Sequence, residues 1–283
     1  MDNAASQRGR HASARDILIE AARGAGDIAL GYFRSGALTS ARIDMKPGGS
    51  PVTEADLAAD AFLAARLGAA FPDAAILSEE REDHPKRLDQ ELLLIVDPID
   101  GTRAFLSGDP RWAVSIALVS GGRPIAGVVH LPALDQTFAA ARGAGASLSG
   151  KPILCSNRVL LAGARVAGPK PMVEAIGEVV GFPFVLEPKV PSLAYRLALV
   201  ANGALDIGFA SEKSHDWDIA AADLILEEAR AGLVGLDGAR LIYNRREIRH
   251  GVLLAAPAGM LGALVAASKT ALTQSRVGAR AAP

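Results

Sequence analysis

The sequence contains a single cysteine, Cys155, which excludes an intramolecular disulfide and any zinc site built on several cysteine thiolates. No apolar run approaches the ~18–20 residues that a membrane-spanning helix needs. The N-terminal arginines Arg8, Arg10 and Arg15 are not followed by the apolar segment of a secretory signal. These absences predict a soluble, cytoplasmic protein that does not insert into a membrane.

An excess of charge of one sign is also lacking. The 30 lysines and arginines nearly cancel the 31 aspartates and glutamates, which gives a formal net charge of -1. A basic surface that would hold a nucleic-acid polymer or an anionic membrane is therefore not expected. Because 50% of the 283 residues are hydrophobic and 22% are charged, intrinsic disorder is excluded. The length allows one large domain or two small ones.

Hydrophobic periodicity predicts a flexible N-terminal tail over residues 1–13, followed by an N-terminal α+β half over residues 14–150. Its first helix ends near residue 34. A second helix begins at Thr53, where Asp56 completes a sequence like a capping box. A loop over Lys46–Pro51 separates the two helices. Strands, the last three of them in an antiparallel meander, are predicted at residues 75–77, 92–96, 113–119, 124–130 and 137–141.

A C-terminal half, residues 151–283, is predicted to begin after a glycine-rich boundary at Gly143–Gly150. Its predicted strands lie at residues 165–167, 184–186, 204–209, 241–243 and 252–255. Its predicted helices lie at residues 171–180, 193–202, 217–229 and 259–270. The alternation of strands and helices indicates an α/β (α+β) fold rather than an all-α fold.

Four carboxylates stand where predicted strands or turns end, namely Glu79, Asp97, Asp100 and Asp218. Carboxylates crowded together repel one another unless a cation neutralises them. Hard oxygen ligands without a histidine or cysteine cluster favour Mg²⁺, or Mn²⁺ as its substitute, over zinc. The four residues therefore predict a divalent metal site.

The segment from Asp97 to Thr102 has the composition of a combined metal and phosphate site. Pro98 stiffens the turn, and the two aspartates stand three residues apart, so that both can point into one space. Gly101 lets the backbone approach a ligand closely. Thr102 stands where a helix can begin, and backbone N–H groups at a helix start favour a phosphate oxygen.

This segment resembles the D-P-[IL]-D-G-T signature of the inositol monophosphatase family of Mg²⁺-dependent, lithium-sensitive phosphatases. Trp217–Ala222 resembles the second family signature, W-D-x-A-A, although Ala222 stands where a glycine is usual. Pro51–Asp56 and Leu77–Glu80 match two further family elements in order and spacing. The resemblance covers about residues 14–260 and implies a layered αβαβα sandwich of the inositol monophosphatase and sugar phosphatase type, usually homodimeric.

The resemblance also implies a metal site for two to three Mg²⁺ ions. The first ion would be held by Glu79, Asp97 and the backbone carbonyl of Ile99. The second would share Asp97 and use Asp100 and Asp218. A weaker third ion would depend on Glu79 and water.

The same resemblance assigns the catalytic residues. Asp56 and Thr102 would position and deprotonate the attacking water, and Lys46 would reach the water around the metals. The backbone amides of Gly101 and Thr102 would bind the phosphate. The implied activity is hydrolysis of a small phosphate ester by metal-activated water.

The substrate remains open between three branches of the family. A glutamate that contacts the inositol ring in inositol monophosphatases is replaced by Ser211, with Glu212 beside it. Arg196 resembles a basic residue of the branch that hydrolyses 3'-phosphoadenosine 5'-phosphate, although an arginine on a helix is more often a surface charge. These two substrates rank nearly equal. Histidinol phosphate ranks third, because histidinol-phosphate phosphatases share the residues found here at Asp100–Arg103 and Phe105.

Other patterns have plainer interpretations. The charged segment Arg81–Gln90 is predicted to be a solvated loop that moves over the site. His215 and Asp216 are also predicted to lie in a solvated loop, with contact to the substrate as the alternative. Gly145–Lys151 fits G-x-x-x-x-G-K, but Pro152 replaces the Ser or Thr that a P-loop needs, which favours a turn between strands. A non-catalytic, partner-binding protein with an idle site is the remaining alternative. The complete set of site residues argues against it.

Overall fold

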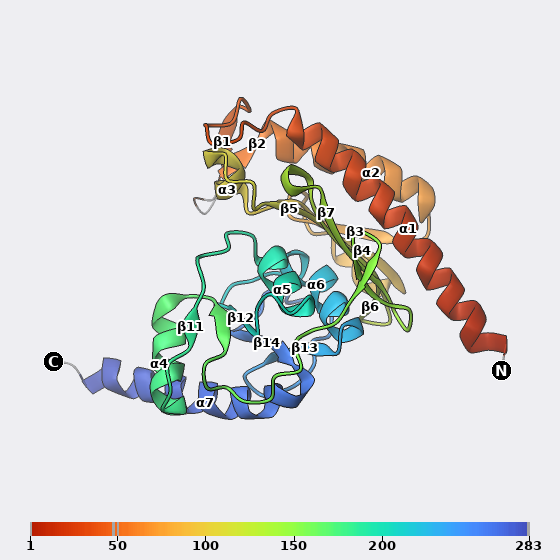
Figure 1. The fold of residues 1–283 in the computed structure, drawn as a ribbon. Helices are drawn as coiled ribbons and strands as arrows, with labels where there is room; N and C mark the ends of the chain where they lie inside the picture. Colours follow the sequence, from red (N-terminus) through yellow and green to blue (C-terminus); the bar gives the residue numbers. More distant parts are fainter. Residues whose placement is uncertain (1, 47–48, 50, 282–283) are drawn as a thin grey trace.

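The computed structural model of the protein describes residues 2–46, 49 and 51–281, and these fold into five layers (Figure 1). The first layer pairs α1 (Asp2–Leu30) with α2 (Glu54–Ala70). The third layer pairs α5 (Leu193–Ala201) with α6 (Asp216–Glu228). The fifth pairs α4 (Lys170–Val180) with α7 (Ala258–Ala281). Two sheets separate the helical layers, which confirms the predicted αβαβα sandwich.

The second layer is a seven-stranded sheet in sequence order, parallel between its first two strands and antiparallel elsewhere. Its strands are β3 (Ala75–Ser78), β4 (Leu92–Asp100), β5 (Ala113–Ser120), β6 (Arg123–Leu131), β7 (Gln136–Ala141), β8 (Gly145–Leu148) and β9 (Lys151–Ile153). The predicted meander is thus confirmed. The sheet continues to Ile153, three residues past the predicted boundary at Gly150. The G-x-x-x-x-G-K segment forms the β8–β9 hairpin, as predicted.

The fourth layer is a mixed five-stranded sheet in the order β11-β10-β12-β14-β13. Its strands are β10 (Arg165–Ala167), β11 (Val185–Leu186), β12 (Ile207–Ala210), β13 (Ala231–Gly235) and β14 (Leu253–Pro257). The short elements outside the layers are β1 (Ile43–Met45), β2 (Pro51–Thr53), α3 (Thr102–Ser107) and the 3₁₀ turns η1 (Pro85–Asp89) and η2 (Pro132–Leu134).

Several predicted elements differ from the structure. The helix predicted to start near Ala14 starts at Asp2, so the predicted flexible tail is helical, and His11 contacts the carbonyl of Arg142 at 3.4 Å. The strand predicted at residues 241–243 is absent from the described residues, because the N–H of Tyr243 donates to Gly122 instead of to a neighbouring strand. β4 continues through the acidic turn to Asp100. Of the predicted loop at Lys46–Pro51, residues 47, 48 and 50 lie outside the described residues.

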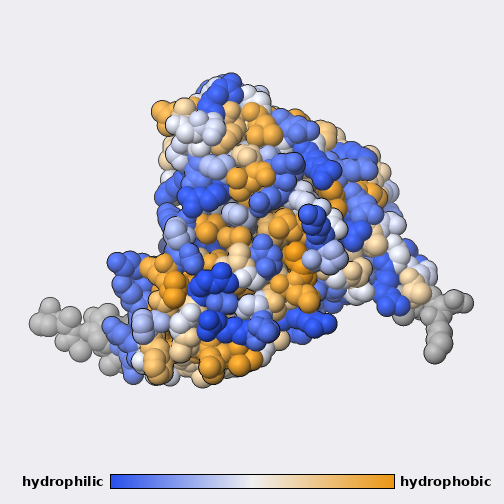
Figure 2. All heavy atoms as spheres, in the orientation of Figure 1, coloured by the Kyte–Doolittle hydropathy of each residue, from blue (hydrophilic) through white to orange (hydrophobic). Residues whose placement is uncertain are grey.

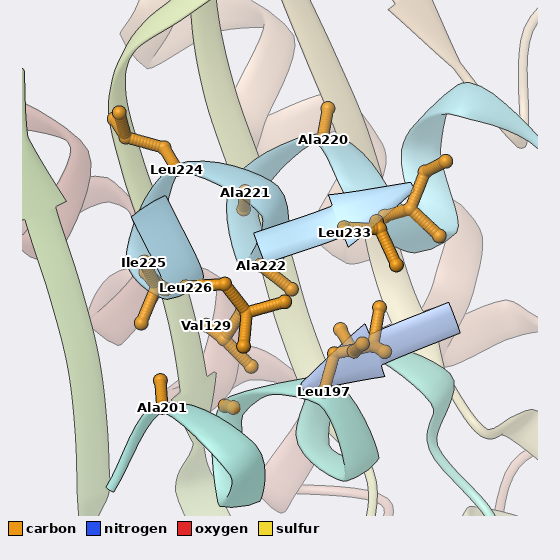
Figure 3. Packing of buried hydrophobic residues seen from close by; sticks show 14 of the residues in the cluster. Val129, Leu197, Ala201, Ala220, Ala221, Ala222, Leu224, Ile225, Leu226 and Leu233 are labelled. Carbon is orange, nitrogen blue, oxygen red and sulfur yellow. The ribbon is translucent and has the colours of Figure 1, made fainter. Parts of the chain in front are cut away.

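Helix α6 occupies the centre of the molecule, and small side chains let it lie close to both sheets. Ala220, Ala221 and Ala222 are fully or almost fully buried. A Cβ on Gly127 of β6 would lie only 2.9 Å from the carbonyl oxygen of Ala221, so glycine is needed for this approach. Figure 3 shows side chains of α5, α6, β6 and β13 meeting in this core. The tight packing fixes the first turn of α6, which carries Asp218.

The segment at residues 81–90 is anchored to the body of the protein. The predicted solvated loop contains a buried residue, Arg87, which is 4% exposed. Its guanidinium donates to both oxygens of Asp83, to Asn244 Oδ1 at 3.0 Å and to the Arg245 carbonyl at 2.9 Å. These contacts hold the segment in place, so the guess of a loop moving over the site finds no support in them.

The exposed surface is mixed in character. Figure 2 shows hydrophilic and hydrophobic residues interspersed on the face that Figure 1 presents. Within the described part of the chain, no helix has both the length and the apolar character required to cross a membrane.

Candidate active site

Three aspartates from distant parts of the sequence meet between the second and third layers. Asp97 and Asp100 lie at the end of β4, where the pairing with β5 shifts its register between these two residues. Asp218 lies in the first turn of α6. One carboxylate oxygen of each lies within 4.8 Å of the others. The structure thus brings together the three aspartates that the sequence predicts as ligands of the second metal.

The electrostatics of this cluster favour a bound cation. Burial, followed by the repulsion of Glu79, Asp100 and Asp218, raises the pKa of Asp97 well above its usual range. Burial raises the pKa of Asp100 to about 6, although hydrogen bonds from Ser192 and the backbone oppose the shift. The pKa of Asp218 is raised by burial and by Asp100. Hard carboxylate oxygens that repel one another fit a Mg²⁺ ion.

Glu79, at the end of β3, is tied to Lys46. The Lys46 Nζ donates to one oxygen of Glu79 and to one of Glu80, each at 2.8 Å. Burial lowers the pKa of Lys46, but the attraction of Glu79 and Glu80 outweighs burial and raises it overall. Burial raises the pKa of Glu80 to about 7. Sequence reasoning assigned no role to Glu80, although the Glu79-Glu80 pair was visible.

Asp56 is placed by the start of α2. Its Oδ2 accepts hydrogen bonds from the Thr53 N–H at 2.7 Å and the Thr53 hydroxyl at 2.6 Å, which completes the predicted capping box. Burial raises the pKa of Asp56 to about 6 despite these bonds. The negative charge of Asp56 is one of the causes that raise the pKa of Asp97. Among the described residues, however, no hydrogen bond joins Asp56 to Thr102.

The turn after β4 holds its own backbone in a fixed shape. The Ile99 N–H donates to Asp97 Oδ1 at 3.0 Å, and the Thr102 hydroxyl donates to the Ile99 carbonyl at 3.2 Å. Gly101 precedes α3 in the left-handed region, at φ +92°. In the described part of the chain, the N–H groups of Gly101 and Thr102 have no hydrogen-bond acceptor. Both are free to donate to a ligand.

Replacing Gly101 by alanine is expected to cost about 1–3 kcal/mol of stability because of its positive φ. The new Cβ would also lie 3.3 Å from the Cα and N of Ser192. Thermal unfolding of Gly101→Ala should be compared with that of Gly68→Ala. Gly68 lies in α2 with nothing near its missing Cβ, so alanine there should stabilise slightly. Equal melting temperatures for the two variants would contradict the expected strain.

The predicted substrate-specificity residues differ in their surroundings. The interpretation of Arg196 as a surface charge is wrong, because its guanidinium donates to the carbonyls of Phe209 at 2.9 Å and Val190 at 2.7 Å, and its Nε is buried. Ser211 and Glu212 lie exposed in the turn between β12 and α6. Arg196 therefore stabilises the backbone at Val190 and Phe209. Ser211 and Glu212 are exposed residues of the turn that leads to Asp218.

His215 and Asp216 do not lie in the solvated loop predicted for them. His215 is the N-cap residue of α6, and its ring stacks on Trp217 with centroids 4.6 Å apart. Asp216 is buried and lies 2.7 Å from the ring nitrogen of His250. The His215 N–H donates to Asp218 Oδ2 at 2.6 Å. These contacts fix the start of α6 and the Asp218 carboxylate on it.

Ser192 was missed by sequence reasoning. Its hydroxyl donates to Asp100 Oδ2, and the Ala194 N–H donates to the same oxygen at 2.7 Å. No local pattern signals this contact, because the partners are far apart in the sequence.

The sequence and the fold are similar to those of known proteins. The sequence pattern of the inositol monophosphatase family matches residues 11–273. The 3'(2'),5'-bisphosphate nucleotidase CysQ of Aggregatibacter actinomycetemcomitans is 30% identical over 241 residues, 81% of this chain and 87% of that protein. Inositol monophosphatase 2 of Solanum lycopersicum is 37% identical over 249 residues, 82% of this chain and 91% of that protein. The solved structure of extragenic suppressor protein suhB from Bartonella henselae is 28% identical, with a TM-score of 0.79 over 91% of this chain and 98% of that one.

Proposed function

Because the chain belongs to the inositol monophosphatase family, a family of phosphatases, we propose that it is a Mg²⁺-dependent phosphomonoesterase. It releases phosphate from a small phosphorylated metabolite, inositol monophosphate or 3'-phosphoadenosine 5'-phosphate. The observation that carries the proposal is the meeting of Asp97, Asp100 and Asp218 within 4.8 Å. Three buried or half-buried carboxylates at this separation are unfavourable in a protein that binds no cation.

The residues present fit the implied metal. Two to three Mg²⁺ ions, or Mn²⁺ in their place, would be held by oxygen atoms of Glu79, Asp97, Ile99, Asp100 and Asp218. When bound, the ions lower the pKa of a water molecule and stabilise charge on the phosphate and the leaving oxygen. The Ile99 carbonyl has two lone pairs, so the hydrogen bond from Thr102 does not prevent it from binding an ion.

The remaining roles belong to side chains and amides of this chain. With Oδ2 of Asp56 bonded to Thr53, its Oδ1 is left to accept a proton from the attacking water, and a pKa of about 6 suits that task near neutral pH. Thr102 orients the same water. Lys46 holds Glu79 in place. The N–H groups of Gly101 and Thr102 bind a phosphate oxygen.

Ser211 and Glu212 are the remaining candidates for contact with the leaving group. Both are exposed on the turn before α6, the helix that carries Asp218. Arg196, in contrast, is proposed to act by positioning backbone rather than by binding a second phosphate, because both of its hydrogen bonds go to carbonyls. This removes one argument for the bisphosphate and leaves the two substrates equally ranked. The homodimer and the cytoplasmic location stay predictions.

Phosphate release with Mg²⁺ should be measured side by side on 3'-phosphoadenosine 5'-phosphate, inositol 1-phosphate and histidinol phosphate. A preference of ~100-fold, about 3 kcal/mol of differential transition-state binding, would assign the substrate. A matched assay with EDTA tests the dependence on the metal. Lack of Mg²⁺-dependent release from all three, together with capture of a specific protein partner, would favour the non-catalytic alternative.

A further inference from the structure

The carboxylate of Asp100 is held on one side by the first turn of α5. Its Oδ2 accepts hydrogen bonds from the Ser192 hydroxyl and from the Ala194 N–H, and the Leu193 backbone also stabilises the ionised carboxylate. Ser192 is completely buried, so water does not compete for its hydroxyl. Because the Ser192 and Ala194 donors both engage Oδ2, Oδ1 is the oxygen that we assign to an ion.

Ser192 also caps the N-terminus of α5. As the N-cap residue of α5, its hydroxyl oxygen accepts a hydrogen bond from the Tyr195 N–H at 3.0 Å. Because this oxygen accepts from the helix, its own proton points to Asp100. The hydroxyl is therefore oriented by the helix it caps.

The position of α5 is itself fixed by hydrogen bonds to the backbone of neighbouring segments. Arg196, one turn further along the helix, donates to the carbonyl of Val190, before the helix, and to that of Phe209, in β12. β12 leads through the turn at Ser211 to α6 and Asp218. The same helix is thus bonded to the Asp100 carboxylate and to the strand that precedes Asp218.

We propose that Ser192 is a positioning residue for the metal site: it fixes the Asp100 carboxylate in the rotation that presents Oδ1 to the ion. The inference rests on the proposed function. Residues that orient a metal ligand typically change metal affinity by 10–100-fold when they are removed, although they do not touch the ion.

The test is to measure Mg²⁺ binding by isothermal titration calorimetry, without substrate, for the unmodified full chain and for Ser192→Gly and Ser192→Ala. Both variants lose the hydroxyl that donates to Asp100, but glycine retains most of the N-cap stability that alanine loses. We expect ~10–100-fold weaker Mg²⁺ binding in both. In phosphatase assays, we expect both variants to hydrolyse substrate more slowly than the unmodified protein at limiting Mg²⁺ and to regain that rate at high Mg²⁺. The KM for the substrate should change little.

Ser156→Ala is the matched control. The Ser156 hydroxyl also donates to an aspartate, Asp206, at 2.8 Å, and Asp206 is not one of the proposed ligands. Its loss should lower stability without changing Mg²⁺ affinity. Unchanged Mg²⁺ affinity in folded Ser192→Gly would overturn the positioning role while leaving the proposed function intact. Absence of Mg²⁺ binding by the unmodified protein would overturn both.

Discussion

Replacing Asp97 by asparagine is expected to lower kcat/KM on the order of a thousandfold, about 4 kcal/mol of transition-state stabilisation, without unfolding the protein. Asp97 is buried, and its burial and the charges of Glu79, Asp100 and Asp218 raise its pKa. Asparagine has nearly the same shape but cannot supply the negative charge that the proposed ions need. Removing that charge also relieves repulsion, so the metal-free variant should melt at a higher temperature than the unmodified protein.

Phosphate release and thermal unfolding of Asp97→Asn are the measurements, with Asp223→Asn as the control. Asp223, in α6, is also a buried aspartate, and burial raises its pKa to about 6, but its carboxylate accepts a hydrogen bond from the hydroxyl of Tyr243 at 3.0 Å. The control should keep its Mg²⁺-dependent activity. Asp97→Asn with Mg²⁺-dependent activity close to that of the unmodified protein would rule out the proposed site.

The metal-free protein is expected to lose stability as the pH rises from about 4 to 8, by on the order of 10 °C in melting temperature. Burial raises the pKa values of Asp56 and Asp100 to about 6 and that of Glu80 to about 7. The unfolded chain therefore releases these protons at a lower pH than the folded protein does. Since the folded state binds more protons through this interval, each rise in pH favours unfolding.

Mg²⁺ should oppose this loss, and its effect should grow with pH, because the ion binds carboxylates in their ionised form. Burial lowers the pKa values of His130 and His215, which act in the opposite sense within this interval, but the carboxylates with raised pKa values outnumber them. Asp109, whose pKa is lowered by its hydrogen bond from Arg111, also opposes the trend, mainly at the acid end of the interval. Melting temperatures measured from pH 4 to 8, with EDTA and with Mg²⁺, check both statements. A flat EDTA curve, or a Mg²⁺ effect equal at pH 5 and pH 8, would contradict them.

The parts of the site that the sequence predicts best are those that a short segment specifies by itself. The capping box of Thr53 and Asp56 involves residues three apart, and the turn at Asp97 contains its own proline and glycine. The fold class follows from periodicity in the same local way. Such patterns need no knowledge of distant contacts, because the interacting atoms are neighbours in the chain.

The parts that could not be predicted depend on contacts between distant segments. Ser192 looks like an ordinary N-cap residue until α5 packs against Asp100, and Arg196 looks like a surface charge until Phe209 lies beside it. Tyr243 lies in a pattern typical of a strand, but its hydroxyl bonds Asp223 and its backbone bonds Gly122. In these cases tertiary packing decides the role, and the local sequence carries no signal of it.

The origin of the ligands in different layers has a consequence for the folding kinetics. Asp97 and Asp100 come from the end of β4, whereas Asp218 comes from α6, far along the chain. These three proposed ligands of the second ion meet only when α6 has docked on the sheet, which is a contact of large sequence separation. A transition state that precedes docking gains nothing from that ion. Mg²⁺ should therefore slow unfolding and leave the rate of folding almost unchanged, so that the ion increases the kinetic stability of the folded protein.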